Sequence, residues 1–239
     1  MDAEQGQRSA VVAWIFARGG SQGLPGKNLR VIGGRSLVAH AVHAGLTAPS
    51  VDRVFVSTDD PEIARAAEDA GAEVPFLRPP ELATAEVAEW KAWQHAVRWL
   101  DEHDARPELF VALPPTAPLR SVEDIERCIR AARTTDADIV LTVTPAARNP
   151  YVNMVRLDDA GFATIAVHPP ETLHRRQDAP PMFDITPVAY VTTPTHVLSA
   201  EHALDGRVGA VQVPRERSID IDDELDLRIA SCLMGTPPA

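Results

Sequence analysis

A short run of glycines and cations, Arg18 to Asn28, directly follows seven consecutive apolar residues, Val11 to Ala17. The run contains four glycines, one proline and two cations, Arg18 and Lys27. Glycines let backbone N–H groups point into one concave space, and such nests bind anions. These residue types at this spacing therefore predict a phosphate-binding loop after a buried strand, although an ordinary glycine-rich connection has the same composition.

Two familiar phosphate loops do not fit this run. The Walker A pattern is Gly-x-x-x-x-Gly-Lys-Ser/Thr, but Ser21 stands at its first glycine and Asn28 follows the lysine. The dinucleotide fingerprint Gly-x-Gly-x-x-Gly also fails, because the glycines are spaced differently. Its acidic partner is expected about 20 residues later, whereas Asp59, the first carboxylate at a strand end, comes much later. A nicotinamide-dependent Rossmann enzyme is therefore the weakest interpretation.

An acidic segment near the C-terminus, residues 218–224, contains a second group of residues that could do chemistry. In an extended chain side chains alternate between faces, so Asp220 and Asp222 point the same way with their Cα atoms about 7 Å apart. Two such carboxylates can share Mg²⁺, which usually binds through one or two carboxylates plus substrate phosphates. The alternative is that Asp222 or Asp223 merely caps the last helix.

Several arginines outside the glycine loop could bind anions. Arg120 ends a proline-rich segment and could meet a phosphate or carboxylate with two hydrogen bonds, or it could simply be solvated. Arg78 follows an extended segment, where a structural salt bridge is the alternative. The adjacent Arg175 and Arg176 could bind an anionic substrate, although an exposed charged loop explains them nearly as well.

Apolar segments alternate with helical patterns along the first 144 residues. Strands are predicted at 11–17, 51–57, 109–113 and 138–144, and helices at 36–44, 62–70, 86–102 and 121–133. Asp60 and Ser121 are expected to cap the second and the fourth of these helices. One apolar stripe is expected along the third helix, formed by Trp90, Trp93, Val97 and Leu100. This alternation is typical of an α/β fold with a mostly parallel sheet covered on both faces. Ligands of such sheets bind beyond the carboxyl ends of the strands. The glycine loop, Asp59, Arg78 and Arg120 all fall at such ends and could therefore converge.

The alternation stops at about residues 145–186, where proline, histidine and charge become frequent. A long structureless segment is improbable in a compact domain, so this segment is predicted to be a β-rich arm. The sheet is expected to resume at 188–192 and 208–213, and a final helix is expected at about 223–234. We interpret residues 1–239 as a single domain with this arm inserted.

Composition excludes several classes of protein. The chain has 239 residues, 45% hydrophobic, with a formal net charge of −11. The acidic balance argues against binding to nucleic acid or to an anionic membrane. The apolar run at Val11 is too short to span a bilayer, and no signal-peptide pattern precedes it, so a cytoplasmic location is predicted. Cys128 and Cys232, the two cysteines, are interpreted as buried thiols.

The loop pattern Arg18-x-Gly-Ser-x-Gly-x-Pro-x-Lys-Asn28 resembles the signature of the CMP-sugar synthetases, the acylneuraminate cytidylyltransferase family that activates sialic acids and KDO. Further segments are similar to motifs of the same family, and the resemblance covers nearly the whole chain. They are Arg78-Pro-Pro-Glu-Leu-Ala-Thr84, Pro115-Thr-Ala-Pro-Leu-Arg120, Arg175-Arg-Gln-Asp178 and Asp220-x-Asp222. The resemblance implies a Rossmann-like three-layer nucleotidyltransferase domain.

The resemblance also implies an activity: transfer of CMP from CTP to a small acidic acceptor, with release of pyrophosphate and with Mg²⁺ as cofactor. The implied nucleotide-binding residues are Arg18, Gly20, Ser21, Gln22, Lys27, Asn28 and Arg78. Acceptor-binding candidates are Arg120, Arg175, Gln177 and Tyr190; Asp220 and Asp222 would hold the metal; and Arg18, Lys27 and Asp222 are the catalytic candidates. Relatives use the arm to form a homodimer, so a homodimer is expected here.

The chain departs from the family pattern at several positions. Gln22 replaces a lysine, Pro114 a glutamine and Ala85 an aspartate, and residues 184–190 replace the Asn-Gly-Ala-Ile-Tyr strand. The departures concentrate on the acceptor side, which leaves the acceptor open between a 2-keto-3-deoxy sugar acid and a small phosphonate. A nucleotide-binding module that has lost transfer activity is the alternative of another class.

Overall fold

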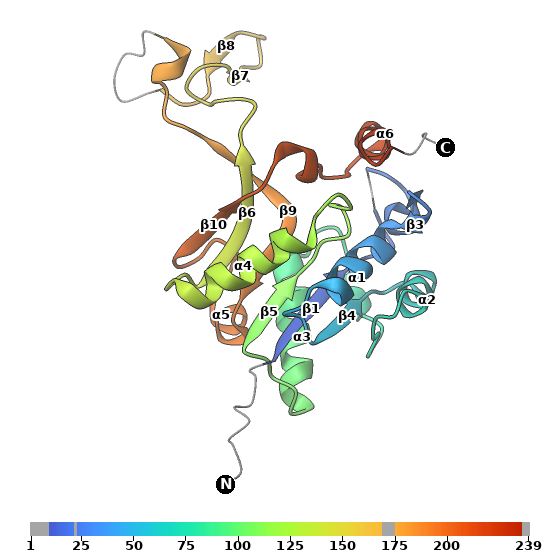
Figure 1. The fold of residues 1–239 in the computed structure, drawn as a ribbon. Coiled ribbons are helices and arrows are strands. Elements are labelled where there is room, and N and C mark those ends of the chain that lie inside the picture. The colour runs from blue at the N-terminus through green and yellow to red at the C-terminus, as the bar shows by residue number, and fades with distance from the viewer. Residues whose placement is uncertain (1–9, 22, 169–174, 236–239) are drawn as a thin grey trace.

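A six-stranded sheet forms the centre of the protein, and the computed structural model describes residues 10–21, 23–168 and 175–235 (Figure 1). The strand order is β10-β6-β9-β5-β1-β4. The strands are β1 (Val11–Phe16), β4 (Arg53–Ser57), β5 (Leu109–Ala112), β6 (Ile139–Pro145), β9 (Phe183–Thr192) and β10 (Val208–Gln212). β9 runs antiparallel to its neighbours β5 and β6, and the other pairings are parallel, so the predicted α/β class with a mostly parallel sheet is confirmed.

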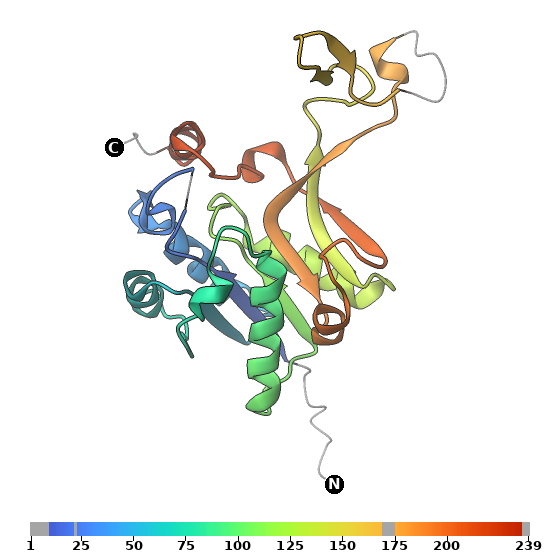
Figure 2. The same ribbon diagram turned by 180° about the vertical axis from the view of Figure 1, so that it is seen from behind.

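Helices cover both faces of this sheet and produce the predicted three layers (Figures 1 and 2). One face carries α1 (Leu37–Thr47), α2 (Pro61–Asp69) and α4 (Val122–Thr134), and the other carries α3 (Glu89–Glu102) and α5 (Pro194–Ser199). Because side chains alternate along a strand, β1 contributes residues to the hydrophobic cores on both faces of the sheet. Ala13 and Ile15 pack in the first core, whereas Trp14 and Phe16 pack in the second, where Phe16 stacks on Trp93 of α3. β1 is therefore buried on both sides.

Side-chain caps mark where most of the helices begin, whereas α3 begins at Glu89 without a side-chain cap, three residues later than the sequence predicts. Asp60 caps α2 with Pro61 in its first turn, and Ser121 forms a capping box with Asp124 at the start of α4. The last helix, α6 (Glu224–Leu233), begins with a capping box between Asp223 and Asp226. Cys128 is buried in α4, but Cys232 is exposed, so the prediction of two buried thiols is wrong for the second.

The arm extends away from the sheet between β6 and β9 (Figures 1 and 2). It contains a short hairpin of β7 (Val155–Leu157) and β8 (Ala163–Ile165) and a 3₁₀ turn at Arg176–Asp178. Each of these two strands is three residues long. A hairpin at β2 (Val31–Ile32) and β3 (Arg35–Ser36) and the short α5 were not expected from the sequence.

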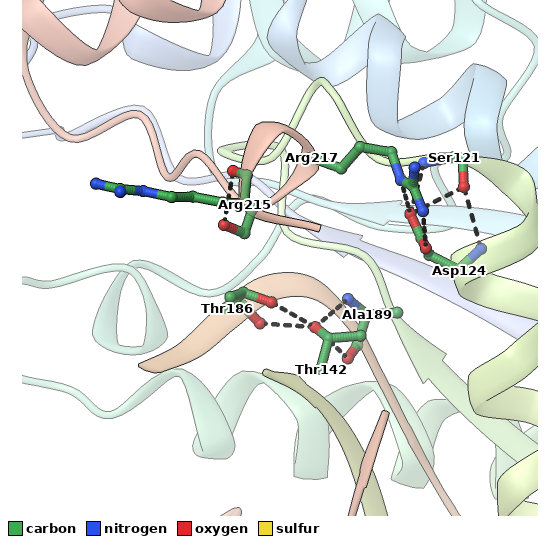
Figure 3. Close-up of polar contacts among 8 residues, drawn as sticks. Ser121, Asp124, Thr142, Thr186, Ala189, Arg215 and Arg217 are labelled. Atoms are coloured by element: carbon green, nitrogen blue, oxygen red, sulfur yellow. Dashed lines mark hydrogen bonds and ion pairs between the residues drawn. The ribbon is translucent and has the colours of Figure 1, made fainter. Parts of the chain in front are cut away.

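β9 contains a bulge where its register with β6 shifts. The register with β6 passes from Leu141 opposite Tyr190 to Thr142 opposite Thr186, so β9 bulges at residues 187–189. The Thr142 hydroxyl fills the bulge, donating to the Thr186 carbonyl at 3.0 Å and accepting from the Thr186 hydroxyl at 2.8 Å (Figure 3). Pro187 has no N–H to offer a ladder, and a bulge is where a strand tolerates it.

Candidate active site

A cavity of about 760 Å³ opens at the carboxyl ends of β1 and β5. Eight of the predicted site residues line it, as expected for the ligand side of such a sheet. They are Arg18, Ser21, Lys27, Asn28, Arg78, Tyr190, Asp220 and Asp222. Gly20, Arg120, Arg175 and Gln177 are not among the lining residues, and Gln22 lies outside the described residues. The structure therefore brings the glycine loop and the acidic pair into one space.

The glycine loop packs directly on the acidic segment, and Gly23 is the residue that permits this contact. A Cβ atom at Gly23 would lie 2.5 Å from the Asp222 carbonyl oxygen, so any side chain would push the two segments apart. Gly26 has φ 64°, a left-handed conformation that favours glycine, and it starts the 3₁₀ turn that carries Lys27. At Gly20 an added Cβ would meet nothing within 4 Å. Close approach is thus required at Gly23, which the sequence did not single out.

An ion pair between Lys27 and Asp222 joins the glycine loop to the acidic segment. The Lys27 ammonium lies 3.2 Å from an Asp222 carboxylate oxygen, although the two residues are far apart in sequence. The residue that caps α6 is Asp223, so the alternative in which Asp222 caps this helix is wrong. The Asp222 carboxylate can therefore pair with Lys27. The pKa of Asp220 is raised, mainly because surrounding protein atoms displace water and also because Asp222 is close. The carboxylates of Asp220 and Asp222 are therefore close enough for their negative charges to repel each other.

This acidic pair fits a magnesium ion in its donor chemistry. Carboxylate oxygens are hard ligands, and two like-charged groups that face one cavity gain from a shared cation. Among the described residues no cluster of three or more His, Cys, Asp or Glu side chains could hold a metal alone. Two carboxylates suffice for Mg²⁺ where waters and substrate phosphates supply the remaining ligands.

Asn28 and Arg18 form the floor of the loop. Asn28 is 4% exposed, and its amide donates to the Arg18 carbonyl at 2.9 Å. Its other side-chain atom, Oδ1, is buried without a hydrogen-bond partner among the described residues. A buried carbonyl of this kind costs free energy unless it is paired, so a ligand donor would satisfy it. The Arg18 guanidinium donates to the Thr84 carbonyl at 3.0 Å and so connects the loop to the opposite wall.

Arg78 is a buried cation on the nucleotide side of the cavity. Its guanidinium donates to the Ser57 hydroxyl at 3.0 Å and to the Ser57 carbonyl at 2.6 Å, and it lies over the Phe16 ring. Burial lowers the pKa of Arg78. Within the described residues no ion pair involves Arg78, so the salt-bridge alternative does not hold there. Its charge is available to a ligand.

Three of the acceptor-binding candidates, Arg120, Arg175 and Gln177, do not line the cavity. Arg120 is 8% exposed and donates to the carbonyls of Pro114 and Pro187, two residues of the cavity wall. Burial lowers the pKa of Arg120 to about 9. In the arm, Arg175 is exposed and pairs with Asp178 at 3.0 Å, and Gln177 is also exposed. Acceptor binding by these three residues stays a prediction.

The sequence did not predict that the start of α3 forms one side of the cavity. Glu89, the first residue of α3, lines the cavity together with Trp90 and Trp93. The helical stripe of tryptophans predicted a buried face correctly, but it gave no sign that a carboxylate would stand at its edge. Thr116 also lines the cavity, and its carbonyl accepts from the Ile221 N–H at 2.9 Å, which holds the acidic segment in place.

An ion pair with a buried carboxylate holds the chain just before the acidic pair. Arg217 donates two hydrogen bonds, at 2.8 and 2.9 Å, to the carboxylate of Asp124, which is 0% exposed (Figure 3). Burial alone would raise the pKa of Asp124, but the hydrogen bonds from Arg217 and Ser121 lower it overall. The pair therefore joins the start of α4 to the segment that leads to Asp220.

We expect Asp124→Asn to lower the free energy of unfolding at pH 7 by about 2 kcal/mol, because it breaks a charged pair whose carboxylate is buried. Since the folded-state pKa is lowered, the stabilisation is complete above the ordinary value of 3.8 and is lost as the pH falls below it. Urea titrations at pH 7, 5 and 3 should show the difference from wild type shrinking towards pH 3. Asp69→Asn, at an exposed position in α2, is the control, and an undiminished difference at pH 3 would contradict the assignment.

Comparisons with known proteins identify the family of the chain. The profile of the cytidylyltransferase family matches residues 12–183. The flagellin modification protein B of Campylobacter coli is 27% identical over 227 residues, 95% of either chain. The CMP-N,N'-diacetyllegionaminic acid synthase of Campylobacter jejuni is 29% identical over 226 residues, 94% of this chain and 95% of its own.

A solved structure shows the same fold. A CMP:2-keto-3-deoxy-manno-octonic acid synthetase complexed with CTP superposes with a TM-score of 0.67 at 19% identity, covering 95% of this chain and 99% of the other. Together, the matched profile, the relatives aligned along most of their length and the shared fold show that the chain belongs to the cytidylyltransferase family of nucleotidyltransferase enzymes.

Proposed function

We propose that this enzyme transfers CMP from CTP to a sugar acid of the 2-keto-3-deoxy type and releases pyrophosphate. The observation that carries the proposal is the placement of a cationic glycine loop and an acidic pair in one cavity, joined by Lys27 and Asp222. The relatives that act on legionaminic and octulosonic acids support the acceptor class. The acceptor hydroxyl attacks the α-phosphorus of CTP in line, and pyrophosphate leaves.

The chain's own residues position the nucleotide and neutralise its charge. Loop amides, Ser21 and the cations Arg18 and Lys27 hold the triphosphate, while Asn28 and Arg78 hold the nucleoside. Because the reaction needs no covalent intermediate, positioning and charge stabilisation supply the catalysis. Asp220 and Asp222 would hold Mg²⁺, which when bound neutralises charge on the phosphate oxygens. Tyr190, Arg120, Arg175 and Gln177 are proposed for the acceptor.

Transfer to a small phosphonate is the second candidate. It is favoured by the altered strand at residues 184–190, where the bulge brings Pro187 to the cavity wall.

The decisive experiment measures pyrophosphate release with Mg²⁺ and each nucleoside triphosphate, against a panel of 2-keto-3-deoxy sugar acids and small phosphonates. Release with CTP and one sugar acid supports the proposal and identifies the acceptor. Release only with a phosphonate supports the second candidate. Tight CTP binding without release for any acceptor would favour a binding module and contradict both.

We also propose a homodimer formed through the arm. The arm exposes several large apolar side chains, among them Val155 at 57%, Leu157 at 69% and Phe162 at 72%. Exposed apolar surface of this kind marks an interaction site. On this proposal Arg175 and Gln177 reach the partner's cavity.

The cytoplasmic location stays a prediction. None of the helices in the described part of the chain is long and apolar enough to cross a membrane.

Light scattering after gel filtration should give twice the monomer mass for the wild type. The double variant Leu157→Asp with Phe162→Asp is expected to elute as a monomer, because two charges replace the apolar surface of the hairpin. Leu46→Asp, at an exposed apolar position outside the arm, serves as the control and should remain a dimer. A monomeric wild type at assay concentration would refute the dimer.

A further inference from the structure

A second cavity, of about 700 Å³, lies at the base of the arm. It opens where β6 and β10 end, between the start of the arm at residues 145–147 and the 3₁₀ turn Arg215–Arg217. Arg127 of α4 also lines it, so the cavity lies on the face of the sheet that α4 covers. Among the described residues none lines both this cavity and the candidate active site. We call it the arm-base cavity.

Three arginines line the arm-base cavity, Arg127, Arg215 and Arg217, although the whole chain carries a net charge of −11. Arg127 and Arg215 form no ion pair with any described residue. Arg217 pairs with Asp124 through Nε and Nη2, and the Arg215 side chain extends away from that pair (Figure 3). The charges of Arg127 and Arg215 are therefore available to an anion.

Thr144, near the end of β6, also lines the arm-base cavity. Side chains alternate along a strand, and Val140 packs in the core beneath α4, so Thr144 points towards the same face. Thr144 is 6% exposed, and its hydroxyl oxygen has no hydrogen-bond partner among the described residues. A buried hydroxyl costs free energy unless it is paired, so an oxygen atom of a ligand in the cavity would satisfy it.

The rest of the lining indicates the size and the chemistry of the ligand. Pro145, Ala146 and Pro214 contribute apolar atoms, and a cavity of about 700 Å³ has the size of a small-molecule site, larger than a lone anion needs. Glu216 is the acidic residue among those that line the cavity, and it is exposed, so water and salt screen its charge. A phosphate group offers three acceptor oxygens, which match two guanidinium groups and a hydroxyl better than the two oxygens of a carboxylate do.

We propose that the arm-base cavity binds a small molecule that carries a phosphate group. Arg127 and Arg215 donate hydrogen bonds to the phosphate oxygens, and the Thr144 hydroxyl donates a further one. Arg217 holds the turn in place through its pair with Asp124. This site is separate from the transfer reaction, because no described residue lines both cavities.

Calorimetric titration with inorganic phosphate, without Mg²⁺ or nucleotide, tests this inference. The wild type is expected to bind phosphate, and Arg127→Gln and Arg215→Gln should each lower the affinity by about tenfold or more, because each removes a charged hydrogen-bond donor. Arg130→Gln is the matched control, since Arg130 is exposed on the same helix and does not line the cavity. Lys27→Met should keep this binding, because Lys27 belongs to the candidate active site.

Thr144→Val separates a binding role from a structural one. Valine has nearly the shape of threonine, and the hydroxyl that it removes has no partner among the described residues. The melting temperature of the variant should therefore be unchanged or higher, while its affinity for phosphate should fall by about fivefold, the loss of one hydrogen bond. A lower melting temperature with the wild-type affinity would show that the hydroxyl serves the fold and would remove Thr144 from the site.

The outcomes of the titrations distinguish this site from the candidate active site. Wild-type affinity in both arginine variants, or binding that Lys27→Met alone abolishes, would place the phosphate on the glycine loop and overturn the proposal. The absence of phosphate binding by the wild type, or tighter binding of acetate than of phosphate, would overturn it as well. Binding that the arginine variants lose supports the proposal whether or not the enzyme releases pyrophosphate, so a failure of the transfer reaction leaves this test intact.

Discussion

An Asp220→Asn enzyme is expected to lose at least about a hundredfold in turnover while its thermal stability is unchanged or higher. The loss follows because Asp220 is proposed to hold the cation that neutralises the phosphates, a contribution of several kcal/mol, and each 1.4 kcal/mol is tenfold in rate. The stability follows from the direction of the Asp220 pKa, which is raised in the folded protein. Folding therefore disfavours the ionised carboxylate at neutral pH, and a neutral amide of the same shape removes that cost.

Two measurements check this prediction: pyrophosphate release over a range of Mg²⁺ concentrations, and thermal unfolding at pH 7.5. Glu224→Gln is the matched control, because Glu224 is an exposed acid near Asp220 that pairs with Arg30 and does not line the cavity. Exposed pairs of this kind contribute little, so turnover of the control should stay close to wild type. Turnover of Asp220→Asn near the wild-type level would remove Asp220 from the metal site.

Lys27→Met is expected to lower kcat/KM for CTP by roughly 10²–10³-fold, the cost of deleting one preorganised charge-stabilising donor. The Lys27 side chain is only 15% exposed, and its ammonium lies in the cavity 3.2 Å from Asp222. The methionine side chain keeps a similar length but carries no charge. The triphosphate loses a cation, and Asp222 loses the partner that compensates its charge, so both binding and turnover should suffer.

Stability of the Lys27→Met variant should change little, because Asp222 is 73% exposed and an open carboxylate can be hydrated. Steady-state kinetics with CTP and a saturating acceptor measure the effect. The chain offers one matched control, since Lys91 is its other lysine. Lys91 donates to Gln94 at 3.3 Å and does not line the cavity, so Lys91→Met should keep wild-type kinetics. Equal kinetics for the two variants would contradict the role of Lys27.

Features that depend on neighbouring residues could be predicted from the sequence. The apolar run of β1, the Asp60 and Ser121 caps and the tryptophan stripe of α3 all occur as expected. Each follows from a periodicity or a capping preference that acts within a few residues. The glycine loop belongs to the same group, because the backbone conformation that Gly26 adopts is a local property.

Features that depend on distant contacts could not be predicted in this way. The extent and direction of β9 depend on its pairing with β5 and β6 and on the Thr142 hydroxyl, which fills the bulge. The prediction of parallel strands rests on the alternation of strands with helices, and that alternation stops before β9, so the sequence did not predict the direction of β9. Arg120 likewise lies in a segment that matches a family motif, yet its surroundings bury it against backbone carbonyls.

By itself the sequence determined which residues could bind phosphate and a cation, since glycine nests and paired carboxylates are local patterns. Only the tertiary structure decided that Lys27 meets Asp222, that Gly23 must lack a side chain, and that Glu89 enters the same cavity. These relations join segments that are far apart in the chain, and packing of the helices and strands, not the periodicity of any one segment, brings them together.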